Sequence, residues 1–163
     1  MSKTRQITLC EGAVSDLDAV MVVMRDSFDP AFGEAWTAPQ CSGLLPMPGV
    51  WLTLARDEGE GEVIGFALGR LVIREAELLL LAVRSDRQGE GIGILLVDGF
   101  TVNALRRGAD RMHLEVRDGN HAVNLYKRAG FHEVGRRKSY YRGPDGKVYD
   151  ALTLSKDAKN NAQ

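Results

Sequence analysis

Apolar residues recur along the chain with two spacings, and these spacings predict where helices and strands lie. A first helix is predicted after Ser15, which we expect to act as its N-cap with Asp18 three residues on. Its buried face is formed by residues at helical spacing: Leu17, Val20, Met21, Met24 and Phe28. A second helix is predicted over residues 94–107 with Gly108 past its end as C-cap, and a short one over 122–128.

Short apolar runs between turn residues predict a sheet of about six to seven strands. The predicted strands are 7–9, 50–55, 63–72, 76–83, 112–116, 131–136 and 148–154. Proline and glycine between 29 and 49 predict a loop with a short helix around 38–44, and 140–144 is also predicted to be a loop. This order predicts an α/β (α+β) fold with a mixed sheet, in one domain over 1–155, followed by a frayed polar tail at 156–163.

Composition narrows the classes of function. The 163 residues carry a formal net charge of -1, which leaves no cationic excess to neutralise a phosphate backbone, so we expect no direct nucleic-acid partner. The longest apolar run, 78–83, is far shorter than the roughly 20 residues that span a bilayer, and we expect a cytoplasmic protein without membrane contact. Cys10 and Cys41 are too few for a disulfide framework and lack nearby histidines, so we expect reduced thiols and no metal.

The segment Gln-Gly-Glu-Gly-Ile-Gly at 88–93 lies between an apolar strand and an amphipathic helix. Glycines there let backbone N–H groups turn toward a ligand, and a helix N-terminus adds partial positive charge, which together favour a pyrophosphate. A tight strand-to-helix turn without a ligand would use the same residues. The Walker pattern fails because no Gly-Lys-Ser/Thr is present, and the Rossmann pattern fails because Ile94 stands where a third glycine is needed.

The spacing of Gln88, Gly91 and Gly93 resembles the Gln/Arg-x-x-Gly-x-Gly/Ala signature of the GNAT acetyltransferases. The resemblance implies the GNAT fold, with a sheet splayed between its two central strands, and acetyl-CoA as acetyl donor. It implies that the strand before the loop pairs with the pantetheine arm and that the loop binds the pyrophosphate. The cofactor-binding residues implied in this way are Leu81, Ala82, Val83, Gln88, Gly89, Glu90, Gly91, Ile92, Gly93, Ile94 and Asn120. The interval from Asn120 to Tyr126 is one residue shorter than is usual in the family.

A narrower resemblance covers residues 75–154 and is to the ribosomal-protein-alanine N-acetyltransferases of the RimI type. It rests on Leu114-Glu115-Val116-Arg117, Asn120, Leu125-Tyr126, Ala129-Gly130-Phe131, Arg136-Arg137, Tyr140-Tyr141 and Asp150-Ala151. Enzymes of this type acetylate the N-terminal alanine of a small-subunit ribosomal protein. The resemblance therefore implies a peptide N-terminus of a ribosomal protein as acceptor, and we expect a monomer or weak dimer.

Acetyl transfer requires a neutral amine, and an α-amino group with a pKa of about 7.7 to 8.0 needs only a modest base. Glu115 alternates with apolar neighbours in a strand, a pattern that also fits a solvated carboxylate, and the resemblance implies that it is the general base. Tyr126 by pattern alone fits a packing residue, and the resemblance implies that it is the general acid. Glu77 is the reserve base, and Glu34 is a weaker candidate for holding the acceptor ammonium.

The acceptor is expected between the 29–49 segment and the 136–141 segment, where Trp36, Tyr140 and Tyr141 either line a groove or pack ordinarily. Two alternatives stay open. The same fold can act on a small amine, polyamine, antibiotic or lysine, because acceptor choice lies in variable loops. The chain can also be a non-catalytic acyl-CoA-binding regulator, whereas a dinucleotide-binding domain would need the missing third glycine and repeated βαβ units.

Overall fold

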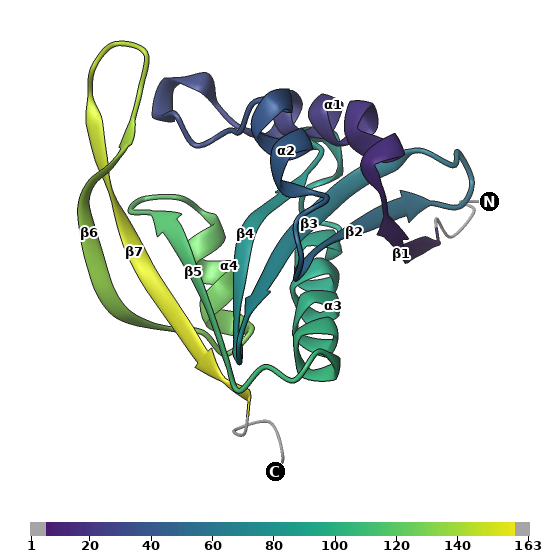
Figure 1. The fold of residues 1–163 in the computed structure, drawn as a ribbon. Helices are drawn as coiled ribbons and strands as arrows, with labels where there is room; N and C mark the ends of the chain where they lie inside the picture. Colours follow the sequence, from purple (N-terminus) through teal and green to yellow (C-terminus); the bar gives the residue numbers. More distant parts are fainter. Residues whose placement is uncertain (1–5, 159–163) are drawn as a thin grey trace.

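The computed structural model describes residues 6–158, within which seven strands form one sheet (Figure 1). The strands are β1 (Ile7–Gly12), β2 (Val50–Asp57), β3 (Val63–Val72), β4 (Glu75–Val83), β5 (Arg111–Arg117), β6 (His132–Arg142) and β7 (Val148–Asp157). The helices are α1 (Leu17–Ser27), α2 (Ala38–Leu44), α3 (Ile92–Arg106) and α4 (Ala122–Arg128). In the order β1-β2-β3-β4-β5-β7-β6, β4 and β5 run parallel and the other neighbours are antiparallel. The predicted α/β (α+β) class with a mixed sheet is confirmed.

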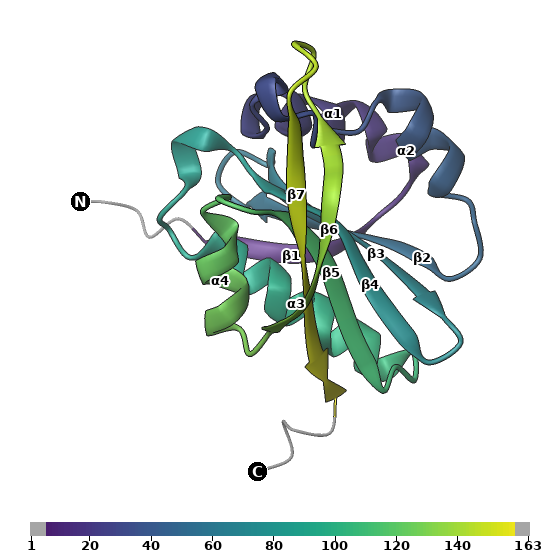
Figure 2. The ribbon, with the colours of Figure 1, turned by 90° about the vertical axis from the view of Figure 1, so that its left-hand side faces the viewer.

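Helices cover both faces of the sheet. The two ribbon views show α1 and α2 on one face and α3 and α4 on the other (Figure 2). Successive residues of a strand point to opposite faces, so Phe66 packs in the apolar cluster under α1 while Ala67 packs in the cluster under α3. On the α3 side Trp51 stacks on Phe100 with ring centroids 5.6 Å apart. The sheet is thus fixed from both sides.

The sheet opens between its two central strands. β4 and β5 pair over only their first four residues, from Glu75 with Arg111 to Leu78 with Leu114. Both strands continue past that point, each held by its other neighbour, β3 or β7. A strand edge without a partner presents backbone N–H and C=O groups to a ligand. The predicted splay is confirmed, and it creates a cleft with the edge of β4 on one side.

Two predicted helix starts are wrong. Ser15 does not cap α1, because it lies in a 3-10 turn, Val14–Asp16, in which the Asp16 carboxylate accepts a 2.9 Å hydrogen bond from the N–H of Ala13. The N-cap position of α1 is Asp16, one residue later, and no side-chain hydrogen bond caps the helix there. α3 begins two residues earlier than predicted, because Gly91 at its N-cap adopts a left-handed conformation with φ +82°.

The C-terminal hairpin is longer than predicted. Residues 140–142 belong to β6 rather than to a loop. β7 runs to Asp157, two residues past the predicted end of the domain, because Ser155 and Lys156 pair with β5. Ladder hydrogen bonds come from the backbone, so polar residues extend a strand where a partner is available. The rest of the predicted tail, from 159 on, lies outside the described residues.

Candidate active site

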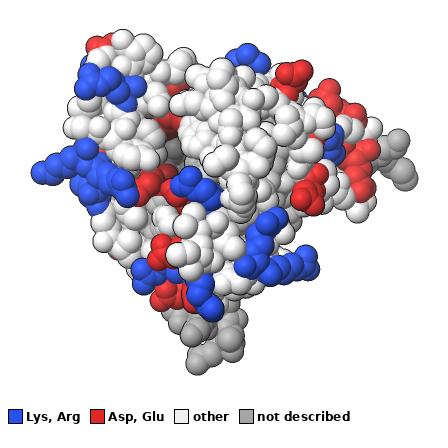
Figure 3. Space-filling model, viewed as in Figure 1, with Lys and Arg blue, Asp and Glu red and all other residues white. Residues whose placement is uncertain are grey.

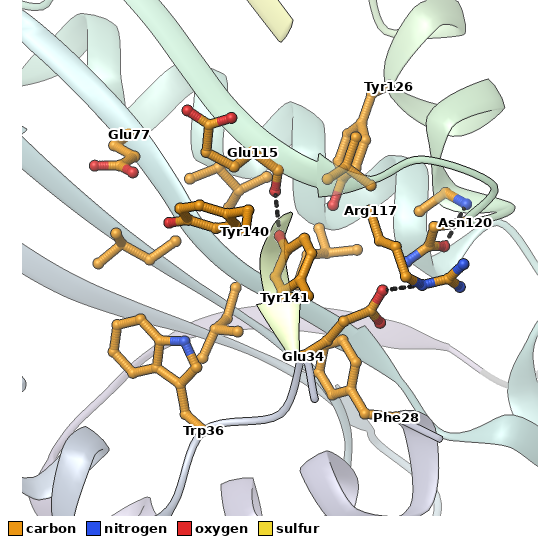
Figure 4. Close-up of a pocket in the computed structure, with 16 residues that line it drawn as sticks. Phe28, Glu34, Trp36, Glu77, Glu115, Arg117, Asn120, Tyr126, Tyr140 and Tyr141 are labelled. Atoms are coloured by element: carbon orange, nitrogen blue, oxygen red, sulfur yellow. Dashed lines mark hydrogen bonds and ion pairs between the residues drawn. The ribbon is translucent and has the colours of Figure 1, made fainter. Parts of the chain in front are cut away.

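A cleft opens where β4 and β5 diverge (Figure 4). The segment 29–49, predicted as a loop, is here called the lip. Glu34 and Trp36 of the lip, with Phe28 just before it, form one wall of the cleft, and Tyr140 and Tyr141 of the β6–β7 hairpin form another. The space-filling view shows this face hollowed, with acidic atoms inside the hollow (Figure 3). The residues predicted for catalysis and acceptor binding all line the cleft: Trp36, Glu77, Glu115, Tyr126, Tyr140 and Tyr141. Of the predicted cofactor residues, Leu81 and Asn120 also line it.

Glu115 points to the cleft face of β5, while Leu114 and Val116 on either side of it are buried against the α3 cluster. Its side chain is 9% exposed, and both carboxylate oxygens are bound. Thr153 donates a 2.7 Å hydrogen bond to Oε2, and Nε of Arg137 lies 3.0 Å from Oε1. Arg137 is itself 63% exposed, so it can leave the carboxylate without opening the fold. Glu115 is therefore held in the cleft by the half-buried Thr153 and by the exposed, displaceable Arg137.

Glu77 lies at the start of β4 on the same face of the sheet. Nη2 of Arg70 is 3.0 Å from its Oε2, and Nε2 of His113 is 3.7 Å from the same oxygen. The interaction with His113, and after it the hydrogen bond with Arg70, outweighs burial and holds the pKa of Glu77 below its ordinary value. A carboxylate with a lowered pKa is a weaker proton acceptor, which disfavours the reserve base.

Tyr126 projects from α4 with its hydroxyl pointing into the cleft (Figure 4). Its side chain is only 6% exposed, and its ring packs edge-on against Phe131 with centroids 6.2 Å apart. Burial, with a smaller contribution from the charge of Glu34, raises the pKa of Tyr126 above its ordinary value of 10.0. The phenol consequently keeps its proton at neutral pH and is a donor aimed at the cleft.

Arg117, at the end of β5, is a cleft residue that the sequence analysis did not assign a role. It forms an ion pair with Glu34 of the lip, and its guanidinium lies 3.7 Å from the centroid of the Phe32 ring. Glu34 is thus already bound by a cation, and an acceptor ammonium would have to share its carboxylate. The two charged residues are 83 positions apart, and no local pattern marks them as a pair.

Tyr140 and Tyr141 both line the cleft, although neighbouring residues of a regular strand point to opposite faces. The register explains this: between the pairs Arg137–Ala151 and Tyr141–Tyr149, three residues of β6 oppose the single residue Asp150 of β7. Within this bulge Ser139 has φ +53°, and its N–H donates a 2.9 Å hydrogen bond to Asp150. The bulge therefore turns two adjacent tyrosines toward the same cleft.

The lip and the β6–β7 hairpin meet backbone to backbone at two glycines. A Cβ on Gly33 would lie 2.0 Å from the carbonyl oxygen of Arg142, and one on Gly143 would lie 2.2 Å from that of Ala31. Both distances are well inside van der Waals contact, so only glycine fits at this approach. The lip therefore touches the hairpin at Arg142 and Gly143, just past the 136–141 segment, and residues 136–142 form a strand rather than the predicted loop.

The glycine loop lies outside the cleft, between the end of β4 and the start of α3. Gly89 and Gly91 both have positive φ, and a Cβ at either would meet nothing within 4 Å, so the loop faces open space. The N-cap of α3 makes no side-chain hydrogen bond, which leaves first-turn N–H groups available to an anion. Nε2 of Gln88 donates to the carbonyl of Val83 at 3.3 Å and ties the loop to β4. The loop and the open β4 edge therefore fit a pyrophosphate joined to an extended arm.

Asn120 follows β5 and precedes α4. Its Oδ1 accepts a 2.9 Å hydrogen bond from the N–H of Ala122, which closes the turn into the helix. The oxygen is therefore committed to the chain, and any contact of Asn120 with a cofactor arm would have to come from its NH₂ group. This local role fits the short interval between Asn120 and Tyr126.

Within residues 6–158, no three His, Cys, Asp or Glu side chains are grouped so that they could hold a metal ion. In the same part of the chain, none of the helices combines the length and apolar character that crossing a bilayer requires.

Known proteins similar to this chain share the fold described above. The sequence model of the Acetyltransferase (GNAT) family matches residues 17–131. A ribosomal protein bS18-alanine N-acetyltransferase of Haemophilus influenzae is 34% identical over 113 residues, which cover 63% of this chain and 77% of that protein. The enzyme of the same description from Escherichia coli K12 is 34% identical over 114 residues, covering 63% and 76%.

Solved structures are similar over almost the whole chain. The crystal structure of the ribosomal-protein-S18-alanine N-acetyltransferase from Escherichia coli superposes with a TM-score of 0.83 at 27% identity, covering 94% of each chain. Arabidopsis thaliana NAA60 in complex with acetyl-CoA has the same fold, with a TM-score of 0.82 at 19% identity over 94% of this chain and 99% of that one. This chain belongs to the GNAT family and is an acetyl-CoA-dependent N-acetyltransferase.

Proposed function

We propose that this acetyltransferase modifies the N-terminal α-amine of a ribosomal protein that begins with alanine. The observation that carries the proposal is the groove between the lip and the β6–β7 hairpin, walled by Trp36, Tyr140 and Tyr141, which runs to Glu115 and Tyr126. Aromatic walls suit an extended peptide, since they offer large rigid contact surfaces with polar tips. The relatives named as ribosomal protein bS18-alanine N-acetyltransferases support the same acceptor, which would be met in the cytoplasm.

Glu115 acts as the general base in this proposal, directly or through one water. It lies on the cleft face of β5 and is fixed by Thr153, and displacement of the exposed Arg137 would free Oε1 to accept the proton of the acceptor ammonium. Glu77 lines the same cleft, but its lowered pKa makes it the weaker candidate. The amine, once neutral, would be able to attack the thioester that bound acetyl-CoA supplies.

Tyr126 acts as the general acid. Acetyl-CoA, when bound, supplies an acetyl group activated as a thioester. The open β4 edge, Leu81 to Val83, would hydrogen-bond the extended arm, and N–H groups of residues 88–94 would bind the pyrophosphate. A main-chain N–H near Ala82 would stabilise the oxyanion that develops during attack. Tyr126 would donate its proton to the departing thiolate sulfur, for which its buried, protonated phenol is suited.

The test is the choice of acceptor. Purified protein is mixed with acetyl-CoA and an alanine-initiated peptide, and free thiol is followed together with the mass of the peptide. The controls are the same peptide with a blocked α-amine and an internal lysine, and a set of small amines and aminoglycosides. Acetylation confined to the free alanine α-amine supports the proposal. Turnover with lysine or small amines and none with the peptide moves the enzyme to another acceptor class, and CoA binding without any turnover indicates a regulator.

A further inference from the structure

An ionic cluster of the buried Asp57 and Arg87 with the half-exposed Glu90 lies beside the glycine loop. Within residues 6–158, the charged residues that are buried as a whole are Asp57 and Arg87, at 1% and 3% exposure. Nη1 of Arg87 lies 2.8 Å from Oδ2 of Asp57 at the end of β2, and its Nε lies 2.7 Å from Oε2 of Glu90 within the loop. Its Nη2 is buried without a hydrogen-bond partner in the described part of the chain. Burying a cation costs folding free energy unless its partners are fixed, so stability alone does not explain this cluster.

The charge balance of the cluster bears on anion binding. Two carboxylates share one guanidinium, and Glu90 stands two residues before α3, where the loop presents its N–H groups. Hydrogen bonds with Glu90 first, and then with Asp57, raise the pKa of Arg87 further above its ordinary value, so the cation is permanent. If the Glu90 carboxylate were not paired with Arg87, its negative charge would repel a pyrophosphate bound at the loop.

We propose that Arg87 is a positioning residue for the pyrophosphate of the acetyl donor. It ties Glu90 to Asp57 and so holds the Glu90 carboxylate on the protein side of the loop, which leaves main-chain N–H groups to face the anion. Asp57 also accepts a 2.9 Å hydrogen bond from the N–H of Gly59, so the anchor itself is fixed in the β2–β3 turn. The inference rests on the cofactor placement in the proposed function and is independent of the acceptor.

The test measures equilibrium binding by calorimetry, without an acceptor, for two ligands: CoA and pantetheine, which lacks the phosphates. Arg87→Met removes a cation and releases the Glu90 carboxylate, and is expected to weaken CoA binding by about 10-fold. Glu90→Gln removes a negative charge near the anion and is expected to tighten binding by about 3-fold at low salt. The double variant is expected to return to within about 3-fold of the starting affinity. Pantetheine affinity should change by less than about 2-fold, and the CoA effects should shrink in 0.5 M salt because exposed charges are screened.

Glu62→Gln is the matched control, since Glu62 is an exposed carboxylate that pairs with Arg84 outside the loop. If Arg87→Met weakens CoA and pantetheine equally, or if Glu90→Gln does not restore its binding, Arg87 only supports the fold. If Arg87→Met does not fold, the Glu90→Gln variant still tests the proposal. The proposal is overturned if Glu90→Gln leaves CoA affinity unchanged, or if Glu62→Gln raises CoA affinity by the same amount. A protein that binds CoA as expected but acetylates no peptide overturns the proposed acceptor and leaves the role of Arg87 standing.

Discussion

Thr153 on β7 donates a 2.7 Å hydrogen bond from Oγ1 to Oε2 of Glu115, the residue directly opposite it on β5. Cross-strand neighbours on one face of a sheet are held at a fixed spacing, so this bond sets the direction of the carboxylate. The second oxygen is held by Arg137, which is solvent-exposed and can move. In the proposed mechanism the oxygen bound by Thr153 stays fixed, and the oxygen beside Arg137 is the one that would accept a proton.

Glu115→Gln is expected to lower kcat for peptide acetylation by about 10² to 10⁴-fold, because the amide keeps the shape and the hydrogen bond from Thr153 but cannot accept a proton. Glu77→Gln is expected to lower kcat by less than about 5-fold, since its lowered pKa makes Glu77 a poor base. Steady-state kinetics with saturating acetyl-CoA give both values. The opposite ranking of the two variants would assign the base to Glu77.

Tyr126→Phe should lower kcat by about 10²-fold and leave CoA affinity unchanged, because the ring contact with Phe131 is kept and only the proton donor is lost. Burial raises the pKa of Tyr126 above 10.0, and the donor form is lost only as pH rises through that raised pKa. Tyr126 should therefore cause no fall in kcat up to about pH 10. A fall at lower pH in the wild type that is absent from the variant would contradict this.

Gly143→Ala should separate the lip from the β6–β7 hairpin, because the added Cβ would lie 2.2 Å from the carbonyl oxygen of Ala31. The expected result is a rise of about 3- to 10-fold in the KM for the peptide, with the KM for acetyl-CoA unchanged, since a wall of the acceptor groove moves and the cofactor loop does not. Gly43→Ala in α2 is the control, because a Cβ there meets nothing within 4 Å. Equal effects of both substitutions would refute the closure.

The fold was largely predictable because its elements carry local signals. The strand before the glycine loop is an apolar run, α3 and α4 end near glycines, and the splay followed from a family signature of three residues, Gln88, Gly91 and Gly93. Such signals depend on neighbours within a few positions, which a single sequence displays. The errors lie at element ends, where Asp16 rather than Ser15 closes the first turn and β7 extends to Asp157.

For the site, the sequence predicted which residues take part but not how they contact one another. Glu115 and Tyr126 fall in motifs, and the structure places both in one cleft. The pairing of Arg117 with Glu34, and the bulge at Ser139 that turns two tyrosines inward, depend on strand register and on contacts between distant segments. Register across β6 and β7 is set by the whole sheet rather than by local pattern, so no reading of neighbouring residues could provide it.

The ion pair between His113 and Glu77 should make stability depend on pH. The pKa of His113 is raised above 6.5 by its bond to Glu77, so its contribution is complete below pH 6.5 and is lost as pH rises through the raised pKa. The pKa of Glu77 is lowered below 4.5, so its contribution is present above that pH and is lost on acidification. The pair is therefore strongest between pH 4.5 and 6.5.

His113→Gln should accordingly lower the free energy of unfolding by about 1 kcal/mol at pH 5.5, the size typical of a partly exposed pair, and by much less at pH 9. For a chain of this length that loss corresponds to a fall of about 2–4 °C in Tm. Thermal unfolding of the wild type and the variant at the two pH values checks this, with His132→Gln on the exposed edge strand β6 as control. An equal fall at both pH values would mean that His113 contributes by packing, because a charged pair cannot persist where the imidazole has lost its proton.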